Sequence, residues 1–389
     1  MKSLEIFSGA GGMACGLEEA GFEHAALVEF NRNACVSLRK NFDPEKVFEG
    51  DIRDFDPASL GEVEIVAGGP PCQPFSLGGK HKSHDDHRDM FPYAIKAIET
   101  LHPKAFVFEN VKGLLRKSFA DYFENIILRL TYPGHPAAAG DWRDCLKTLR
   151  KVNEWDGVKY VVKRALLNAA DYGVPQTRER VVIVGVRADL GLEWSFPEPT
   201  HSRERLLWEQ HVSGEYWKRH GMRPTVGSLD GRDVKAAAAA LRHKFGMFEP
   251  DGLPWLTARD ALADLPDPRG HHDLPDHLFI DGARTYPGHT GSHIDWPSKT
   301  IKAGGHGVPG GENMLRFEDG TVRYLTIREA KRIQTFPDDF AVTGAWGEAL
   351  RQIGNAVPVR LARIIGDRLV GTLAAAGTRQ VRGRQASRS

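Results

Sequence analysis

The chain has few cysteines and no long apolar run. Its 389 residues include four cysteines, Cys15, Cys35, Cys72 and Cys145, and none of them forms a CxxC pair. This set excludes the framework of a disulfide-rich secreted protein and a cysteine-based zinc site, and it fits a reducing compartment. The opening MKSLEIFSGAGG lacks the apolar core of a signal peptide, and no stretch approaches the ~18 apolar residues of a membrane-spanning helix. We therefore expect a soluble intracellular protein with no membrane association.

Neither positive nor negative charge is in excess. Lys and Arg together number 52, against 51 for Asp and Glu. The molecule as a whole therefore attracts no polyanion, and a nucleic-acid partner would have to be bound by local basic patches.

Short apolar runs alternate with amphipathic stretches in the first half of the chain. The runs include LEIF, AALVEF, VFEGDI, EIVAGG, AFVFEN and VVIVGV. Runs of this length, separated by helical patterns, are typical of βαβ units. The sequence therefore predicts an α/β fold with a mostly parallel sheet that is covered by helices on both faces.

The pattern changes near Phe196 and divides the chain. Basic and aromatic residues, followed by a Pro-, Gly- and His-rich stretch, predict an irregular second domain over residues 196–326. Helical patterns return in residues 327–376, and their apolar stripe is expected to pack on the α/β domain of residues 1–195. Residues 377–389 are basic and are expected to be a disordered tail.

A glycine-rich turn, FSGAGG, follows the first predicted strand. Gly9, Gly11 and Gly12 would let a ligand approach the backbone where a helix begins. Because the pattern is not GxGxxG, it disfavours a dinucleotide and leaves room for a smaller nucleoside. Glu29 ends the second predicted strand, where an acid could bind ribose hydroxyls, and Asp51 ends the third, where it could meet an adenine amino group. The alternative is a tight turn with ordinary surface acids.

A cysteine follows the fourth predicted strand, in GGPPCQPFS. The two prolines fix the backbone before Cys72 at the carboxyl edge of the sheet, where α/β folds bind ligands. A thiol is also the side chain best able to attack near neutral pH, although an inert structural cysteine is the alternative. Glu109 ends the next predicted strand at the same edge and is a candidate proton donor.

Two arginines, Arg178 and Arg180, precede the strand VVIVGV. A guanidinium group suits carbonyl and phosphate oxygens, and the alternative is a solvated cluster of salt bridges. A nucleoside cofactor, a thiolate, a carboxyl group and an arginine together suit methyl transfer to C5 of a pyrimidine. That carbon becomes nucleophilic only after a thiolate has added to C6, so the cysteine has a necessary role.

The chain resembles the cytosine-C5 DNA methyltransferases of bacteria. FSGAGG, Glu29, Asp51, GGPPCQPFS, FENVKG, QTRERVVIVG, RYLTIREAKRIQTFPDDF and GNAVP occur in the order typical of that family. The resemblance implies a Rossmann-like S-adenosylmethionine-dependent methyltransferase fold with an inserted, irregular DNA-recognition domain. It also implies a DNA (cytosine-5-)-methyltransferase that flips a cytosine out of a specific duplex sequence.

The resemblance further implies a role for particular residues. Cys72 would be the nucleophile, Glu109 would contact N3 and the exocyclic amine of cytosine, and Arg180 would hold O2 with Arg178 nearby. Phe30 stands where relatives often have Trp, and either ring can pack on adenine. The expected cofactor is S-adenosyl-L-methionine, with a site formed by Phe7, Gly9, Gly11, Gly12, Glu29, Phe30, Asp51, Ile52 and Asn355.

The resemblance also points to partners. We expect duplex DNA as the substrate, a monomer in the bacterial cytoplasm, and no metal ion. A restriction or other defence system is a candidate partner. The polar segment from His81 to Arg88 is a candidate contact for DNA phosphates, with a metal site and a merely solvated loop as alternatives.

Three other functions stay open on the sequence. An RNA cytosine-C5 methyltransferase can share every catalytic motif, although residues 196–326 are longer than such an enzyme needs. A non-catalytic DNA-binding regulator could use the fold as a scaffold, but it would not need Cys72, Glu109 and Arg180 together. A nicotinamide oxidoreductase fits poorly because the glycine pattern is wrong.

Overall fold

The chain forms two compact units in the computed structural model. The structure describes residues 1–71, 89–224, 234–303 and 313–386. The first unit consists of Met1–Leu167, Glu179–Pro197 and Ala362–Ser389, and the second consists of Asn168–Arg178 and Glu198–Leu361.

The first unit is built on a seven-stranded sheet with the order β3-β2-β1-β4-β5-β7-β6. Strands β1 to β5 run parallel, and β7 runs antiparallel to β5. The predicted α/β fold with a mostly parallel sheet is therefore confirmed. The strands are β1 (Lys2–Ile6), β2 (Glu23–Glu29), β3 (Val47–Glu49), β4 (Ile65–Gly68), β5 (Ala105–Val111), β6 (Tyr160–Asn168) and β7 (Glu179–Arg187).

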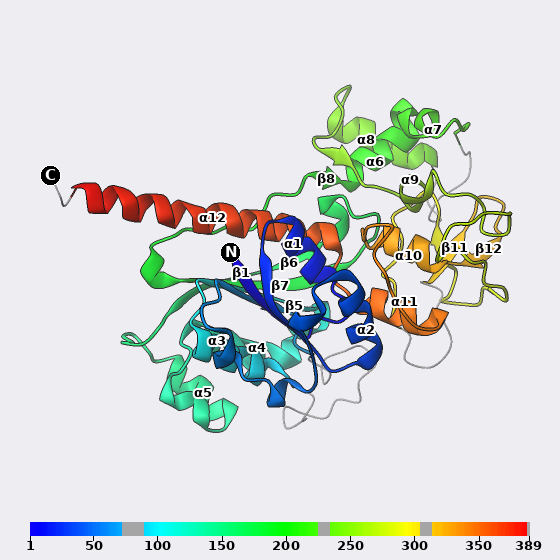
Figure 1. Ribbon diagram of the computed structural model, residues 1–389. Helices are drawn as coiled ribbons and strands as arrows, with labels where there is room; N and C mark the ends of the chain where they lie inside the picture. The colour runs from blue at the N-terminus through cyan, green and yellow to red at the C-terminus, as the bar shows by residue number, and fades with distance from the viewer. Residues whose placement is uncertain (72–88, 225–233, 304–312, 387–389) are drawn as a thin grey trace. The chain divides into compact units, whose positions relative to one another are not determined.

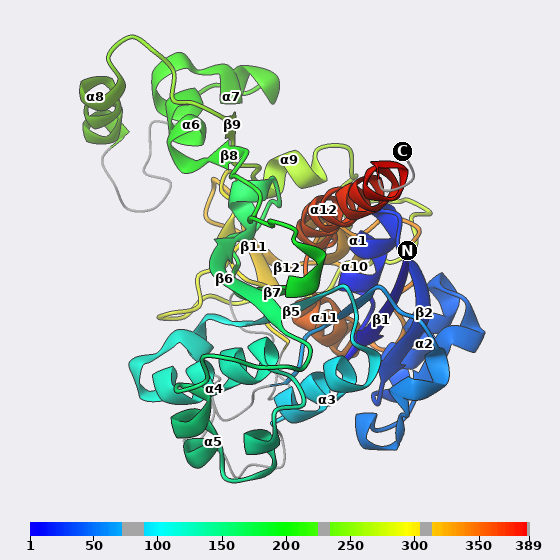
Figure 2. The same ribbon diagram turned by 90° about the vertical axis from the view of Figure 1, so that its left-hand side faces the viewer.

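Helices cover both faces of this sheet (Figure 1). Figure 2 shows α3 and α4 on one face, and α1 with α12 on the other. On the α3 and α4 side, Ile6 and Phe108 of the sheet pack with Ile95 and Phe123 in the main core. The helices are α1 (Gly12–Glu19), α2 (Arg32–Asn41), α3 (Phe91–Leu101), α4 (Ala120–Thr131), α5 (Trp142–Leu149) and the part of α12 (Val359–Ala386) from Ala362 onward.

The strand order reverses between β1 and β4. From β1 the chain moves outward to β2 and β3, and it then returns to β4 and continues to β5 on the other side. Ligands of open α/β sheets bind at the carboxyl ends of the strands at such a point. The two strands approach closely here, because a Cβ atom on Gly68 would lie 2.1 Å from the carbonyl oxygen of Ile6. The topology therefore predicts a ligand site beyond Ile6 and Gly68.

The second unit is built from short strands and helices. Its small core is centred on Tyr216, Trp217 and Trp255. A three-stranded sheet is formed by β10 (Ser292–His293), β11 (Met314–Arg316) and β12 (Val322–Tyr324), and a two-stranded sheet by β8 (His201–Ser202) and β9 (Leu253–Pro254). The helices are α6 (Arg203–Trp208), a π-helical turn (Glu209–Ser213), α7 (Glu215–Arg219), α8 (Val234–Phe245), α9 (Ala258–Leu262), α10 (Ile327–Ile333) and α11 (Trp346–Asn355).

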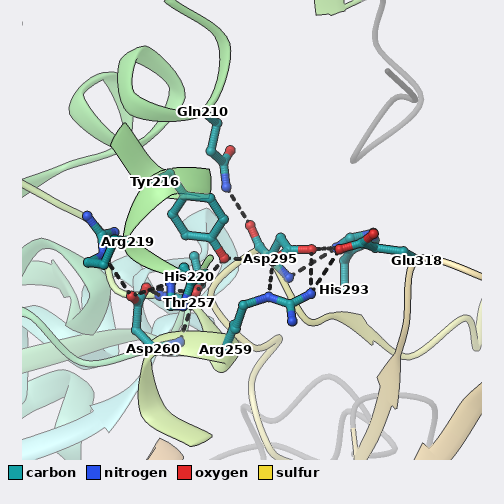
Figure 3. A network of polar contacts seen from close by, with 10 residues as sticks. All are labelled: Gln210, Tyr216, Arg219, His220, Thr257, Arg259, Asp260, His293, Asp295 and Glu318. Atoms are coloured by element: carbon teal, nitrogen blue, oxygen red, sulfur yellow. Dashed lines mark hydrogen bonds and ion pairs between the residues drawn. The ribbon is translucent and has the colours of Figure 1, made fainter. Parts of the chain in front are cut away.

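A network of polar contacts around Asp295 joins these short elements (Figure 3). The buried Asp295 carboxylate accepts hydrogen bonds from the Tyr216 hydroxyl at 2.7 Å and from Nε of Arg259 at 2.5 Å. The amide of Gln210 donates to the backbone oxygen of Asp295 at 2.7 Å. Because a buried carboxylate is stable only when its oxygens are paired, this network holds α7, α9 and the chain after β10 in one arrangement.

The compact units differ from the predicted boundaries in several places. Asn168–Arg178, which falls in the predicted first domain, belongs to the second unit. Residues 327–361, which contain α10 and α11, belong to the second unit. Hydrogen bonds explain this grouping, since the Gln334 amide pairs with Gln176 and the Trp346 indole donates to the carbonyl oxygen of Leu325. Beyond Gly377, where we expected disorder, the backbone continues α12 as far as Ala386. The predicted catalytic and DNA-recognition domains are defined by function, and this division stays a prediction.

No helix in the described ranges is both long enough and apolar enough to cross a membrane.

Candidate functional site

The glycine-rich segment forms a tight turn between β1 and α1. Gly9 and Gly11 have φ angles of 56° and 88°, and Phe7 also has a positive φ of 58°. A positive φ costs glycine little, whereas in Phe7 it is a strained conformation that is typical of binding sites. A Cβ atom added to Gly9 would meet nothing within 4 Å. The backbone at Gly9 is therefore accessible to a ligand.

Glu29, the last residue of β2, is bonded directly to this turn. Its buried carboxylate accepts hydrogen bonds from the backbone N–H groups of Gly9 at 2.8 Å, Phe30 at 3.1 Å and Asn31 at 2.8 Å. A carboxylate has about four acceptor positions, so about one is left for a ligand. The turn and the acid that the sequence predicted at one sheet edge thus lie together.

The other predicted cofactor residues of the first unit lie on the segments after β2 and β3. Phe30 is 71% exposed, although it is a large aromatic residue. Asp51 caps the 3-10 turn Ile52–Asp54, and its carboxylate accepts from Nε of Arg53 at 2.9 Å. The hydrogen bonds from Arg53 lower the pKa of Asp51 to about 2, so this acid is ionised at neutral pH. Ile52 packs into the main core.

Glu5 was missed by the sequence-based reasoning. It lies on β1, two residues before Phe7, and it is buried. Its Oε2 atom has no hydrogen-bond partner among the described residues. Burial, and then the nearby charge of Glu29, raise the pKa of Glu5 well above its usual value. A buried acid in the otherwise apolar run LEIF is the signal that could have revealed it.

The segment before Cys72 is held by two hydrogen bonds. The side-chain amide of Asn110 donates to the carbonyl oxygen of Pro70 at 2.9 Å, and the backbone N–H of Met90 donates to that of Pro71 at 3.2 Å. Asn110 is itself buried on β5. The backbone that leads to Cys72 is therefore fixed from the neighbouring strand. Cys72 itself and the segment from His81 to Arg88 lie outside the described residues.

Glu109 and Arg180 form an ion pair at the same sheet edge. Nε of Arg180 lies 2.5 Å from Oε1 of Glu109, and the two side chains are 12% and 11% exposed. The antiparallel pairing of β7 with β5 produces this contact, because it places the start of β7 beside the end of β5. The second oxygen of Glu109 faces Gly69, where an added Cβ atom would lie 3.4 Å away. An acid and a guanidinium group therefore meet next to the backbone that leads to Cys72.

Arg178 lies in a different environment from Arg180. It belongs to the second unit, and its buried guanidinium group donates to the carbonyl oxygens of Gly354 at 2.8 Å and Ala356 at 3.0 Å. These two residues flank Asn355, which is exposed at the end of α11. Arg178 thus fixes the backbone on both sides of Asn355, and the structure does not bring it together with Arg180.

The cysteines other than Cys72 are unsuited to nucleophilic attack. Cys15, Cys35 and Cys145 are buried, and none of these three forms a disulfide bond. Burial raises the pKa of Cys35 to about 12, and it also raises the pKa of Cys145. A buried thiol that holds its proton is a poor nucleophile. Within the described ranges, no group of three or more His, Cys, Asp or Glu residues is arranged to hold a metal ion.

A family model covers most of the chain. The model for C-5 cytosine-specific DNA methylases matches residues 1–136, 141–247 and 279–371. The matched ranges include the glycine-rich turn, the Glu109–Arg180 pair and the segment around Asn355.

Curated relatives are similar over almost the whole chain. A Type II methyltransferase of Neisseria gonorrhoeae, M.NgoMIV, is 32% identical over 375 residues, which are 95% of this chain and 97% of the relative. A second Type II methyltransferase, M.PspPI of a Psychrobacter strain, is 33% identical over 96% of this chain and 80% of its own length.

Solved structures share the fold at low sequence identity. The DNMT2 protein of Spodoptera frugiperda superposes with a TM-score of 0.56 at 18% identity, over 95% of this chain and 99% of that one. The Dnmt2 methyltransferase of S. pombe superposes with a TM-score of 0.57 at 17% identity, over 96% and 99% of the two chains. At such identities the likeness concerns the fold alone.

Proposed function

The chain belongs to the C-5 cytosine-specific DNA methylase family and is a DNA (cytosine-5-)-methyltransferase, and we propose that it acts through a covalent bond between Cys72 and C6 of a flipped cytosine. The family match confirms the predicted enzyme class and the Rossmann-like methyltransferase fold, and it does not favour an RNA substrate. The observation that carries the proposed mechanism is the buried Glu109–Arg180 pair beside the backbone that leads to Cys72.

The family and fold are those of S-adenosylmethionine-dependent methyltransferases. We propose that the cofactor binds over the glycine-rich turn, with its ribose hydroxyls on Glu29 and its adenine on the exposed ring of Phe30. The unpartnered oxygen of the buried Glu5 can accept a hydrogen bond from an amino group of the cofactor. When bound, the cofactor supplies a methyl group on a sulfonium centre. The proposed site comprises Phe7, Gly9, Gly11, Gly12, Glu29, Phe30, Asp51, Ile52 and Asn355, with Glu5 added.

The proposed chemistry begins with Cys72. Its thiolate forms a bond to C6 of the cytosine, and the electron pair of the C5–C6 double bond moves to C5. C5 then takes the methyl group, with the electron pair of the broken sulfur–methyl bond remaining on the sulfur of the cofactor, which would leave as a neutral thioether. Loss of the proton from C5 restores the double bond and breaks the bond between sulfur and C6, so that the thiolate is regenerated.

Glu109 and Arg180 would stabilise the ring during attack. Glu109 would hold a proton at N3, which lets the ring accept electron density when sulfur adds to C6. Arg180 has further N–H donors beyond the one that faces Glu109, and these can bind O2 of the base. Their low exposure strengthens both interactions, because little water competes for them.

Arg178 would act indirectly. Its donors are directed at the backbone around Asn355, so we propose that it positions Asn355 and does not touch the base. The sequence placed Arg178 among the catalytic residues, and we now propose a positioning role for it. Asn110 would have a similar role for Cys72, through the carbonyl group of Pro70.

The substrate would be a specific sequence in duplex DNA. A cytosine cannot react inside the duplex, so it must be flipped out at a cost of a few kcal/mol. We propose that residues 196–326 recognise the sequence around it, whereas residues 1–195 and 327–376 carry the chemistry. The curated relatives are bacterial Type II methyltransferases, which supports a restriction or other defence system as the partner. We further propose that the protein is a monomer in the bacterial cytoplasm.

Sequencing of bisulfite-treated nucleic acid tests this function. The full chain would be expressed in bacteria that lack cytosine methylation, and both genomic DNA and tRNA would be sequenced. We expect methylation at one short DNA motif and none in tRNA, and we expect it to disappear in Cys72→Ser. Methylation confined to tRNA would overturn the DNA assignment, and methylation that survives in Cys72→Ser would overturn the mechanism.

A further inference from the structure

Two adjacent apolar side chains extend into solvent after α8. Met247 is 94% exposed and Phe248 is 82% exposed. No other adjacent pair of large apolar residues in the described ranges is exposed to this extent. Leaving a Phe and a Met in water loses the free energy that their burial would provide, so such a pair often marks a contact surface.

The turn that carries this pair is rigid at its start. Gly246 ends α8 with a φ of 65°, and its N–H donates to the carbonyl oxygen of Arg242 at 2.8 Å. The N–H of Phe248 donates to the carbonyl oxygen of Phe245 at 3.2 Å. These contacts form a helix C-terminal cap in which the glycine conformation reverses the chain.

The turn is also held at its other end. Glu249 forms an ion pair with Arg205 of α6, with 2.5 Å between Oε2 and the guanidinium nitrogen. The same guanidinium group donates to the carbonyl oxygen of Pro250 at 3.4 Å. Both views show α8 beside α6 (Figures 1 and 2). The exposed pair is therefore presented by a fixed turn.

The helix that leads to this turn is basic. α8 carries Lys235, Arg242, His243 and Lys244, and it has no acidic residue. Lys244 lies 3.4 Å from Glu204, but both side chains are largely exposed, so this pair is weak. After the tip, Glu249 is paired with Arg205 and Asp251 is exposed, so the cationic side chains lie on the helix that precedes the tip. An apolar tip next to a basic helix suits a polyanion with stacked rings better than it suits a purely apolar protein surface.

We propose that Met247 and Phe248 form a wedge that enters duplex DNA at a base step, while Arg242 and Lys244 bind the flanking phosphates. This proposal rests on the proposed function, since it requires duplex DNA as the substrate. Met and Phe are among the side chains that unstack base steps in this way, and the unstacking lets DNA bend. The wedge would thereby lower the cost of flipping the target cytosine.

The double variant Met247→Ala/Phe248→Ala tests the wedge. The probes are duplexes that contain the sequence methylated by the enzyme, each with 2-aminopurine at a different position. The fluorescence of 2-aminopurine rises where the base unstacks. With wild type we expect a rise at the target and at one further step. In the double variant we expect the second rise to disappear and DNA affinity to fall by about 10- to 100-fold. The melting temperature should not change, because both side chains are exposed.

Two further variants complete the test. Val161→Ala is the control, because Val161 is a half-exposed apolar residue on β6 of the first unit. The DNA affinity of this variant should equal that of wild type. Arg242→Gln/Lys244→Gln should lower the slope of log affinity against log salt by about two. The wedge proposal is overturned if wild type methylates the duplex and the Met247/Phe248 variant binds and unstacks that duplex as well as wild type does. A wild type that neither binds nor methylates the duplex overturns the proposed function as well.

Discussion

The side-chain amide of Asn110 donates a 2.9 Å hydrogen bond to the carbonyl oxygen of Pro70, two residues before Cys72 in the sequence. Asn110 follows Glu109 directly on β5. One strand therefore positions the acid and also fixes the backbone that leads to the nucleophile. This arrangement makes the thiol and the carboxyl group depend on the same short segment.

Asn110→Ala should slow formation of the covalent intermediate. Removal of the amide leaves the Pro70 carbonyl without its donor, and loss of a buried hydrogen bond costs about 1–3 kcal/mol. We expect the rate of covalent trapping on 5-fluorocytosine DNA to fall by about 10- to 100-fold, with DNA affinity changed less than threefold. Single-turnover trapping and DNA titration measure the two quantities.

Asn125→Ala is the matched control for that variant. Asn125 is also buried in the first unit, on α4, and it does not hydrogen-bond to the described segment before Cys72. The Oδ1 atom of Asn125 has no hydrogen-bond partner among the described residues, so its removal breaks no such bond, and the variant should keep its trapping rate per folded molecule. Equal trapping defects in the two variants would mean that Asn110 supports only the fold.

Glu109→Gln should reduce the chemical step by at least about 100-fold, as expected for a lost proton donor. The neutral amide also removes the charge that pairs with Arg180. Lys112→Ala provides a nearby control, because Lys112 directly follows β5 and its ion pair with Glu179, the first residue of β7, at 2.8 Å is exposed and worth little. Rapid-quench single-turnover rates should separate the two variants, and an unchanged rate in Glu109→Gln would remove the residue from this role.

Phe30→Ala should weaken cofactor binding without affecting stability. The ring is 71% exposed, so its removal leaves no cavity, but an aromatic face for adenine is lost. We expect the Kd for S-adenosylmethionine to rise by about 10-fold, measured by calorimetric titration. Val36→Ala, which truncates another partly exposed apolar side chain, should leave this Kd unchanged. If both variants bind the cofactor with the same affinity, adenine does not pack on Phe30.

His24 should make the first unit sensitive to mild acid. Burial lowers the pKa of His24 to about 4, and its ring contacts the Ser3 hydroxyl at 2.9 Å and the Ala14 carbonyl oxygen at 3.1 Å. The unfolded state, with a pKa near 6.5, then binds the proton more tightly, so stability is lost as pH falls from 6.5 towards 4. Between pH 7 and pH 5, wild type should lose about 2 kcal/mol more than His24→Gln in urea denaturation. Equal losses would contradict this assignment.

The sequence predicted the elements that have local signals. Alternating apolar runs located β1 to β5 and β7, and Glu29 ends its strand as predicted. The conformation at Gly9 was foreseeable because few other residues adopt a positive φ. These features depend on short segments, so one sequence contains enough information for them.

Features that depend on contacts between distant segments were not predictable. Arg178 and Arg180 are two residues apart, yet one donates to the backbone around Asn355 and the other pairs with Glu109. No local pattern distinguishes the two guanidinium groups. The bond from Asn110 to Pro70 spans 40 residues and depends on the register of β4 with β5. The grouping of residues 327–361 with the second unit likewise arises from tertiary packing.

Covalent trapping on DNA that contains 5-fluorocytosine is the most direct test of the Cys72 mechanism. Fluorine cannot leave C5 as a proton does, so the bond between sulfur and C6 persists after methyl transfer. The DNA would carry 5-fluorocytosine at the target position of the sequence that the enzyme methylates. With this DNA and S-adenosylmethionine, wild type should form a complex that survives denaturing electrophoresis and whose DNA-linked peptide contains Cys72. Cys72→Ser should form none. A wild type that methylates ordinary DNA but is never trapped, or a linkage at another residue, would contradict the mechanism.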